Sequence, residues 1–184
     1  MPSIITHSVV GIFWASLFET KTNKIKFWFF SIFCTIIPDF DVVAFKLGIS
    51  YEDFFGHRGF FHSLVFAFIF AILIVFLFFR NVKINSFAKY GLIIYFFILT
   101  ASHGLLDTLT SGGLGIALFS PFDNARYFYS FTPIKVSPIG VGAFFSERGL
   151  MVLKSEIIWV WIPLIISFLT IKVFQKILYA LKTK

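Results

Sequence analysis

Residues 57–79 read HRGFFHSLVFAFIFAILIVFLFF, and this stretch decides what kind of fold the chain adopts. It opens with two histidines and an arginine, and from Leu64 to Phe79 it contains no polar side chain. A run of this length approaches the roughly 20 apolar residues that an α-helix needs to cross a bilayer. The stretch therefore predicts a membrane helix, at about residues 60–79, that carries ionisable side chains at its beginning.

The composition of the whole chain also indicates a membrane protein. Hydrophobic residues make up 58% of the 184 residues, 29 residues are phenylalanine, and only 14% are charged, compared with roughly 25% charged in soluble domains. We expect an all-α, polytopic membrane helix bundle that forms a single domain over residues 1–184. Its transmembrane helices should number about five and lie near residues 3–19, 25–45, 60–79, 90–109 and 156–178.

Several other classes of protein or segment are disfavoured. No Lys or Arg precedes the first apolar window, which we expect to be a mature helix rather than a secretory signal. The single cysteine, Cys34, lies within an apolar window, so it can form no internal disulfide and should only pack. The formal charge of +7 includes no run of about five to eight basic residues, so no nucleic-acid partner is expected.

The basic residues predict an orientation, because Lys and Arg in short loops mark the cytoplasmic side of a membrane. The connections between the first and second and between the third and fourth helices are basic, as is the end of the chain. We therefore expect a multi-pass protein of the inner membrane with an extracytoplasmic amino terminus and a cytoplasmic carboxyl terminus. The basic residues in question are Lys21, Lys24, Lys26, Arg80, Lys83, Lys89, Lys172, Lys176, Lys182 and Lys184.

All four histidines lie in short polar clusters within or beside the apolar windows. With five alternating helices, every cluster reaches the extracytoplasmic face. Imidazole and carboxylate are common ligands of divalent metals, and burying them in apolar surroundings is costly unless something neutralises them. The clusters predict one metal site whose ligands are drawn from His7, Asp39, Asp41, His57, His62, His103 and Asp107.

Two pairs gain support from their spacing. His103 and Asp107 are four residues apart, so both side chains lie on one face of a helix and can bind one ion. A packed, hydrogen-bonded histidine is the alternative. Asp39 and Asp41 follow Pro38, which should end or kink the second helix and let one or both carboxylates turn inward. Alternatively, they are helix-end acids that face lipid headgroups.

The remaining three histidines are interpreted from the residues around them, because their spacing alone does not place them on one helical face. His57 and His62 are five residues apart, and Gly59 between them allows a turn. We place His57 in a loop and His62 in the first helical turn. Arg58 between them is a phosphate contact or an interfacial cation. His7, in the run Thr6-His7-Ser8, is either a ligand or a hydrogen-bonded helix-cap histidine.

The long connection between the fourth and fifth helices, over residues 108–155, is apolar and aromatic and should lie at the extracytoplasmic interface as a lid. Near its end, Glu147 is a candidate ligand or proton carrier and Arg148 a candidate anion contact. Glu156 is expected in the first turn of the last helix, where an acid is favourable.

Taken together, the ordered motifs resemble a known family. The likeness covers nearly the whole chain and is to the YdjM-like inner-membrane metal-dependent hydrolases, some of which are under LexA control. This resemblance implies a bacterial or archaeal cell membrane, a bound divalent metal and hydrolysis. The motifs are Thr6-His7-Ser8, Pro38-Asp39-Phe40-Asp41, His57-Arg58-Gly59-Phe60-Phe61-His62-Ser63, Ser102-His103-Gly104-Leu105-Leu106-Asp107, Ser146-Glu147-Arg148-Gly149 and Ser155-Glu156-Ile157-Ile158-Trp159.

A looser similarity is to the zinc-dependent phospholipase C and single-strand nuclease superfamily. His7, Asp39 or Asp41, His62 or His57, and His103 with Asp107 match the order of its ligands. No histidine follows Asp107, so the later ligands of a three-metal site are missing and one or two ions are expected.

The expected function is hydrolysis of a phosphoester or related ester by water that one or two zinc-like ions activate. An aspartate that is not fully committed to metal, Asp39 or Asp41, would take the proton, and Arg58, Arg126 or Arg148 would steady developing negative charge. The expected partners are membrane lipids or a lipid-linked substrate. The alternative is a metal-binding membrane protein without enzymatic activity, either a transporter or a structural metal site.

Overall fold

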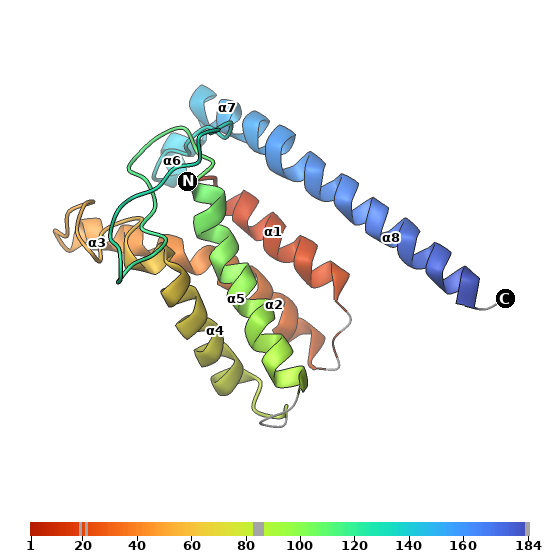
Figure 1. Cartoon of the computed structure of the whole chain (residues 1–184). Helices are drawn as coiled ribbons and strands as arrows, with labels where there is room; N and C mark the ends of the chain where they lie inside the picture. Colours follow the sequence, from red (N-terminus) through yellow and green to blue (C-terminus); the bar gives the residue numbers. More distant parts are fainter. Residues whose placement is uncertain (19, 21, 83–86, 183–184) are drawn as a thin grey trace.

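The computed structural model describes residues 1–182 except 19, 21 and 83–86, and it confirms the predicted all-α class (Figure 1). The part that is described contains no strand. Two 3₁₀ helices, η1 (Ile37–Val42) and η2 (Phe60–His62), and one π-helix, η3 (Ile157–Trp161), interrupt the α-helical segments. The α-helices are α1 (Ile4–Leu17), α2 (Lys24–Ile36), α3 (Val43–Lys46), α4 (Leu64–Phe78), α5 (Phe87–Asp107), α6 (Val141–Phe144), α7 (Glu147–Glu156) and α8 (Ile162–Lys182).

Four helices form a bundle and the last one departs from it. Helix α2 packs between α1 and α5, and α4 packs against α5. Helix α8 begins beside α1 and diverges from the bundle toward the carboxyl end of the chain (Figure 1). None of its described residues is buried, which fits a helix that faces lipid.

The structure supports fewer membrane spans than the five predicted. Three segments are long and apolar enough to cross a bilayer, namely Lys24–Lys46, Phe87–Asp107 and Glu147–Lys182. The other two expected spans are apolar but short, because α1 has 14 residues and α4 has 15. At a rise of 1.5 Å per residue, such helices cover only about 21–23 Å of a hydrocarbon core of about 30 Å.

The expected helix at residues 60–79 begins later than predicted, for a local reason. Residues 60–62 form the 3₁₀ helix η2, and the Ser63 side chain then accepts a hydrogen bond from Phe66 N and caps α4. Among the lysines that predicted the orientation, Lys21, Lys83 and Lys184 lie outside the described residues. The orientation across the membrane stays a prediction.

The connection after α5 covers the end of the bundle at which the polar clusters meet (Figure 1). It is held by two isolated β-bridges, Thr110 with Ile134 and Ile116 with Tyr127. Its predicted role as a lid is consistent with this place, and the connection also contains the short helices α6 and α7.

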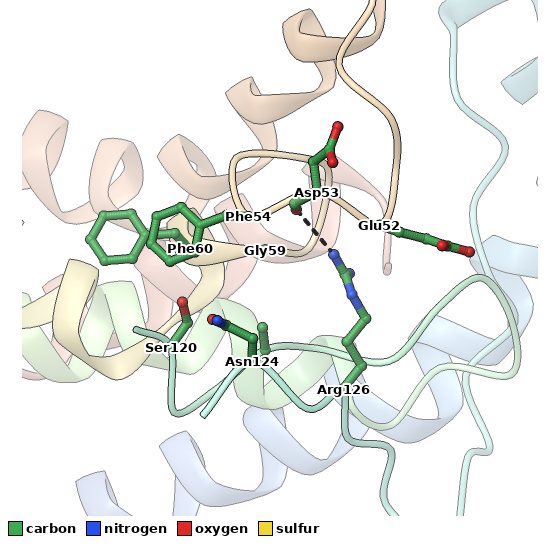
Figure 2. A pocket seen from close by; sticks show the side chains of 9 residues that line it. Glu52, Asp53, Phe54, Gly59, Phe60, Ser120, Asn124 and Arg126 are labelled. Atoms are coloured by element: carbon green, nitrogen blue, oxygen red, sulfur yellow. Dashed lines mark hydrogen bonds between the residues drawn. The ribbon is translucent and has the colours of Figure 1, made fainter. Parts of the chain in front are cut away.

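Arg126 fastens this connection to the loop that precedes η2. Its guanidinium donates to the backbone oxygens of His57 (3.1 Å), Gly115 (3.3 Å), Tyr51 (2.8 Å) and Asp53 (3.5 Å). Figure 2 shows this side chain reaching across a pocket of about 240 Å³ toward the Asp53 carbonyl. The Arg126 donors therefore hold the loop in place, which argues against the suggested role in steadying reaction charge.

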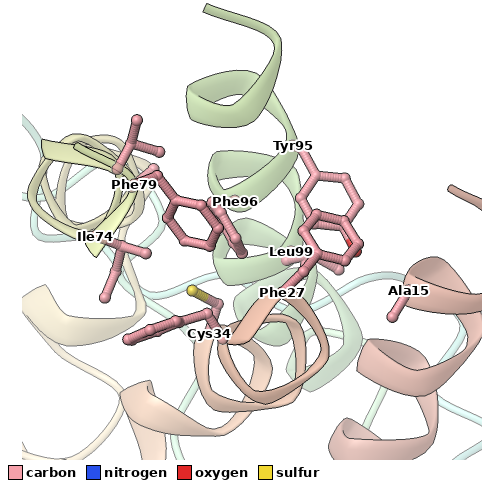
Figure 3. Close-up of a cluster of buried hydrophobic side chains, with 11 residues drawn as sticks. Ala15, Phe27, Cys34, Ile74, Phe79, Tyr95, Phe96 and Leu99 are labelled. Atoms are coloured by element: carbon pink, nitrogen blue, oxygen red, sulfur yellow. The ribbon is translucent and has the colours of Figure 1, made fainter. Parts of the chain in front are cut away.

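The apolar core lies among α1, α2, α4 and α5 (Figure 3). Cys34 is completely buried in it, beside Phe27, Phe96 and Leu99, as expected of a cysteine that only packs. A polar link at the edge of this core joins the hydroxyls of Ser31 and Tyr95, which are 2.8 Å apart.

A glycine permits the close approach of α1 to α2. A Cβ atom at Gly11 would lie 2.8 Å from Ile32 Cα and 2.8 Å from Ser31 O, which is closer than real side chains come. Small residues at such contacts let helix backbones approach in membranes. This contact holds α1, and with it His7, against the rest of the bundle.

We predict that Gly11→Ala lowers the free energy of unfolding by about 1–3 kcal/mol, because the added methyl group forces α1 away from α2. Gly91→Ala is the matched control, since nothing lies within 4 Å of a Cβ at that position of α5. It should be neutral or stabilise the helix by up to about 1 kcal/mol. Thermal unfolding in detergent measures both variants, and equal stability of the two would contradict the tight contact.

Candidate metal centre

The polar clusters predicted from sequence meet at one end of the bundle. His7 comes from α1, and His103 and Asp107 come from α5. Asp39 comes from η1 and His62 from η2. All five side chains are at most 9% exposed, so the structure brings them together in the protein interior.

Pro38 shapes the segment that supplies the two carboxylates. As predicted, the α-helix ends just before it, at Ile36, and the chain continues as the 3₁₀ helix η1. With about three residues per turn, side chains two positions apart point roughly 120° apart. Asp39 therefore faces His103, while Asp41 faces His57 and His62. Both carboxylates are buried rather than turned toward headgroups.

A glycine also brings His62 against His103. A Cβ atom at Gly104 would lie 2.6 Å from the backbone oxygen of His62, so only glycine lets η2 pack this closely on α5. The two imidazole Nε2 atoms are 3.1 Å apart as a result. His7 lies on the other side of His103, with the two rings stacked at a centroid distance of 3.8 Å.

Four side chains present ligand atoms to one point. Asp39, His62, His103 and Asp107 each offer an atom within 4.8 Å of all the others. From His103 Nε2, Asp39 Oδ1 is 3.2 Å away. From His62 Nε2, Asp39 Oδ1 is 3.6 Å and Asp107 Oδ2 is 3.7 Å away. His7 Nε2 lies 3.4 Å from the other oxygen of Asp107, Oδ1.

These separations suit a metal better than direct hydrogen bonds. Zinc binds nitrogen and oxygen at about 2.0–2.2 Å, so two ligand atoms of a tetrahedral ion are roughly 3.3–3.6 Å apart. The four distances of 3.1, 3.2, 3.6 and 3.7 Å between these ligand atoms lie close to that range. Hydrogen bonds between such groups are usually about 2.7–2.9 Å long.

Neighbouring groups set which nitrogen of each ring faces the centre. His103 Nδ1 lies 2.8 Å from the backbone oxygen of Thr35, and His62 Nδ1 lies 3.0 Å from Asp41 Oδ2. Because the Thr35 oxygen can only accept, His103 Nδ1 carries the proton and its neutral Nε2 presents a lone pair. This lone pair faces His62 Nε2 at 3.1 Å, a separation that suits a proton or a cation between the two nitrogens.

Unpartnered atoms give an independent argument. Both oxygens of Asp39, both oxygens of Asp107 and both ring nitrogens of His7 are buried and find no hydrogen-bond partner among the described residues. Leaving such atoms unpaired in the interior is costly. Asp39, Asp41 and Asp107 are all buried, and only Asp107 among them has the Arg58 guanidinium beside it in the described residues. The residues present therefore fit a divalent cation.

The electrostatics of His62 reflect the same excess of negative charge. Burial by itself lowers the pKa of the His62 imidazole. The neighbouring carboxylates, first Asp41 and then Asp39 and Asp107, raise the pKa by more than burial lowers it, to about 9.

His57 and Asp41 support the centre from outside. They form a second group with His62 that could hold a metal. However, His57 Nδ1 is 2.6 Å from Asp41 Oδ1, which is too short for two ligands of one tetrahedral ion and fits a shared proton. Asp41 also accepts from Arg58 N at 3.0 Å. Asp41 thus orients His62, as carboxylates commonly do for metal-bound histidines.

Arg58 is neither an interfacial cation nor an open anion contact. Its side chain is buried, and its guanidinium donates to Gly112 O (2.8 Å), Leu114 O (2.7 Å) and Thr110 Oγ1 (3.1 Å). Its Nε lies 3.5 Å from Asp107 Oδ2. The residue has a φ of 63°, a left-handed conformation that is costly for an arginine and is held by these contacts.

Glu147 and Arg148 are not brought to this centre. Both are exposed in the first turn of α7 and belong to neither group of potential ligands. Their predicted roles therefore have no support from the geometry.

Glu156 has a role that the sequence signals missed. It ends α7 rather than beginning the last helix, and it is completely buried. Its carboxylate accepts hydrogen bonds from Ser3 N, from Ser3 Oγ at 2.7 Å and from Thr6 Oγ1 at 2.7 Å. Glu156 thereby fixes the first turn of α1, next to His7. The polar run around His7 was the only available signal, and it did not indicate a distant partner.

The chain matches known proteins over most of its length. The family model described as YdjM inner membrane protein matches residues 1–179. The Escherichia coli (strain K12) inner membrane protein YbcI is 38% identical over 166 residues, which cover 89% of this chain and 92% of YbcI. No solved structure matches the chain. The two descriptions name a membrane location, so hydrolysis and the looser phospholipase C similarity stay predictions.

We predict that Arg58→Ala lowers the free energy of unfolding by about 3–5 kcal/mol, because it leaves the Asp107 carboxylate and three backbone or hydroxyl acceptors without their buried partner. Arg80→Ala, at an exposed position after α4, is the control and should change stability by less than about 0.5 kcal/mol. Denaturant unfolding in detergent compares them. An Arg58 variant as stable as the control would show that the buried guanidinium is dispensable.

Proposed function

The chain belongs to the family of YdjM inner membrane proteins, and on that premise we propose that it is a membrane-bound, metal-dependent hydrolase. The metal is a divalent ion, with zinc as the first choice, because imidazole and carboxylate ligands suit it. The reaction is hydrolysis of a phosphoester or related ester of a lipid or lipid-linked substrate. The site faces the extracytoplasmic side and the carboxyl terminus the cytoplasm.

One observation carries the proposal. Ligand atoms of Asp39, His62, His103 and Asp107 converge within 4.8 Å, and the carboxylate oxygens among them have no hydrogen-bond partner in the part of the chain that is described. A set of this kind can bind a cation without first breaking existing bonds. When bound, a divalent ion lowers the pKa of water toward about 7 and polarises an ester oxygen.

The same residues offer room for one or two ions. Asp39, His62, His103 and Asp107 Oδ2 form one ligand set. Asp107 Oδ1 lies 3.4 Å from His7 Nε2 instead. If a second ion were bound, His7 and Asp107 would hold it, and it would supply further Lewis acidity for the hydrolysis.

We assign the role of accepting the proton that the water loses to Asp39 rather than Asp41. Asp41 already faces His57, His62 and the Arg58 backbone N–H, so its lone pairs are occupied. Asp39 Oδ1 faces both ligand histidines, whereas its Oδ2 has no described partner. Asp39 Oδ2 can therefore accept a proton from water at the centre.

A structural metal site is the second candidate function, and the burial of the ligands favours it. Each ligand side chain is at most 9% exposed, and closed coordination by protein is typical of structural zinc. In that case the ion would hold α1, η1, η2 and α5 together without turning over a substrate.

The first prediction of the proposal concerns metal content. The purified protein should bind one or two divalent ions per chain, and His103→Ala and Asp39→Ala should lose them because each removes a converging ligand. Asp41→Asn should retain the site but weaken its affinity about 10–100-fold, as expected for a supporting residue. Elemental analysis and metal titration measure both effects.

Asp123→Asn is the control for these variants, because Asp123 is exposed and its carboxylate accepts hydrogen bonds only from Tyr127 and Ala125 among the described residues. Its metal content should equal that of the unsubstituted protein. Equal content in His103→Ala and Asp39→Ala as well would end the ligand assignment.

The second prediction separates the two candidate functions. Metal-loaded protein in detergent should hydrolyse at least one member of a panel of phospholipids and generic phosphodiesters, and His103→Ala should reduce the rate to background. Full metal loading without turnover on any panel member, combined with a lower melting temperature after chelation, would favour the structural role instead.

A further inference from the structure

An apolar groove opens beside the metal centre. It has a volume of about 380 Å³ and lies between η1, α3, the loop before η2 and the beginning of α4. Its inner wall includes Ala44 and Phe61, and its rim includes Phe40, Leu47 and Phe55. The size is within the usual range for small-molecule sites, about 300–1,000 Å³.

The lining of the groove selects the chemistry of an occupant. Asp41 is its only polar or charged lining residue. A molecule with donors or charges along its length would leave them unpaired against this wall, at a cost of several kcal/mol each in a wholly apolar environment. A hydrocarbon chain has no such groups and gains from burial.

Asp41 connects the groove with the metal centre. Asp41 lines the groove, and its fully buried carboxylate lies behind that wall, 3.0 Å from Nδ1 of His62. The Nε2 atom of His62 is among the converging ligand atoms. An apolar groove that comes within one residue of a ligand histidine matches a molecule with a hydrocarbon tail and a polar head.

The rim indicates where such a molecule comes from. Phe40 is 55%, Leu47 73% and Phe55 51% exposed, so the apolar lining continues onto the outer surface. In an inner membrane protein, a surface of this kind contacts lipid. The bilayer therefore supplies the occupant from the side, and no aqueous entrance is needed.

We propose that this groove binds the hydrocarbon chain of a membrane lipid and places the lipid's polar head at the Asp41 end, beside the metal ligands. The assignment rests on the proposed function, because hydrolysis at the centre is what makes this lipid a substrate. It specifies a substrate class, namely an ester with a long acyl or isoprenoid chain, and a lateral route of entry.

The test uses the full chain reconstituted in phosphatidylethanolamine vesicles that contain a phosphatidylglycerol with a diazirine in one acyl chain. After illumination, mass spectrometry of peptides locates the lipid adducts. Adducts should concentrate on the segment over residues 40–66. Ala44→Trp, which fills the groove, should lower adduct yield on that segment at least about fivefold and leave metal content unchanged.

Two further variants make the test robust. Leu73→Trp is the matched control, because Leu73 is 49% exposed on α4 and does not line the groove. Its labelling should equal that of the unsubstituted protein. Leu47→Asp places a charge at the rim, at a position exposed enough to avoid disturbing the fold, and should also lower labelling of the segment.

The outcomes distinguish this assignment from the proposed function. Metal-loaded protein with adducts spread evenly over its apolar surface, or with labelling unaffected by Ala44→Trp and Leu47→Asp, would overturn the groove assignment alone. Labelled protein without bound metal would overturn the proposed function alone. If Ala44→Trp changed the oligomeric state and not the labelling, the groove would be a contact between copies and the assignment would fall.

Discussion

The structure depends on one electrostatic constraint: the carboxylates of Asp39, Asp41 and Asp107 are buried at one end of an apolar bundle, and the Arg58 guanidinium lies beside Asp107. In low-dielectric surroundings an uncompensated charge is far more costly than any single apolar contact is favourable. The local features described above compensate for this buried negative charge. Arg58 neutralises part of the charge and adopts a left-handed backbone conformation to do so. Histidine imidazoles lie on the other sides of these carboxylates, and the ring nitrogens that face the carboxylates leave a space that fits a cation.

The apolar part of the molecule serves this arrangement by bringing distant segments together. Gly11 and Gly104 allow backbone contacts that any side chain would prevent, so α1 meets α2 and η2 meets α5 at close range. Glu156 secures the beginning of α1 from a position more than a hundred residues away. Elsewhere the helices pack in the usual way. The geometry of the polar end is decided by the few points where two backbones approach each other unusually closely.

Much of this could be predicted from the sequence, and the limits are physical. Composition and apolar windows predicted an all-α membrane protein, and Pro38 predicted the end of α2. The position of His103 and Asp107 on one helical face predicted their meeting. The number of spans was overestimated, because apolarity does not reveal that a 3₁₀ turn such as η2 delays the beginning of a helix. The separate roles of Asp41 and His57 depend on differences of a few tenths of an ångström between interatomic distances, and spacing along the chain does not determine these. Arg58 and Glu156 were misjudged because their side-chain partners lie far away along the chain.

The distribution of the ligands along the chain has a consequence for biosynthesis. Asp39 and His62 emerge from the ribosome well before His103 and Asp107, and Arg58 finds its carbonyl acceptors only at Gly112 and Leu114. Until α5 has been inserted and the following connection has closed, the early carboxylates and the guanidinium lack their native partners. The first half of the nascent chain therefore cannot complete the centre, and an ion that binds there would have its full ligand set only after α5 has been inserted.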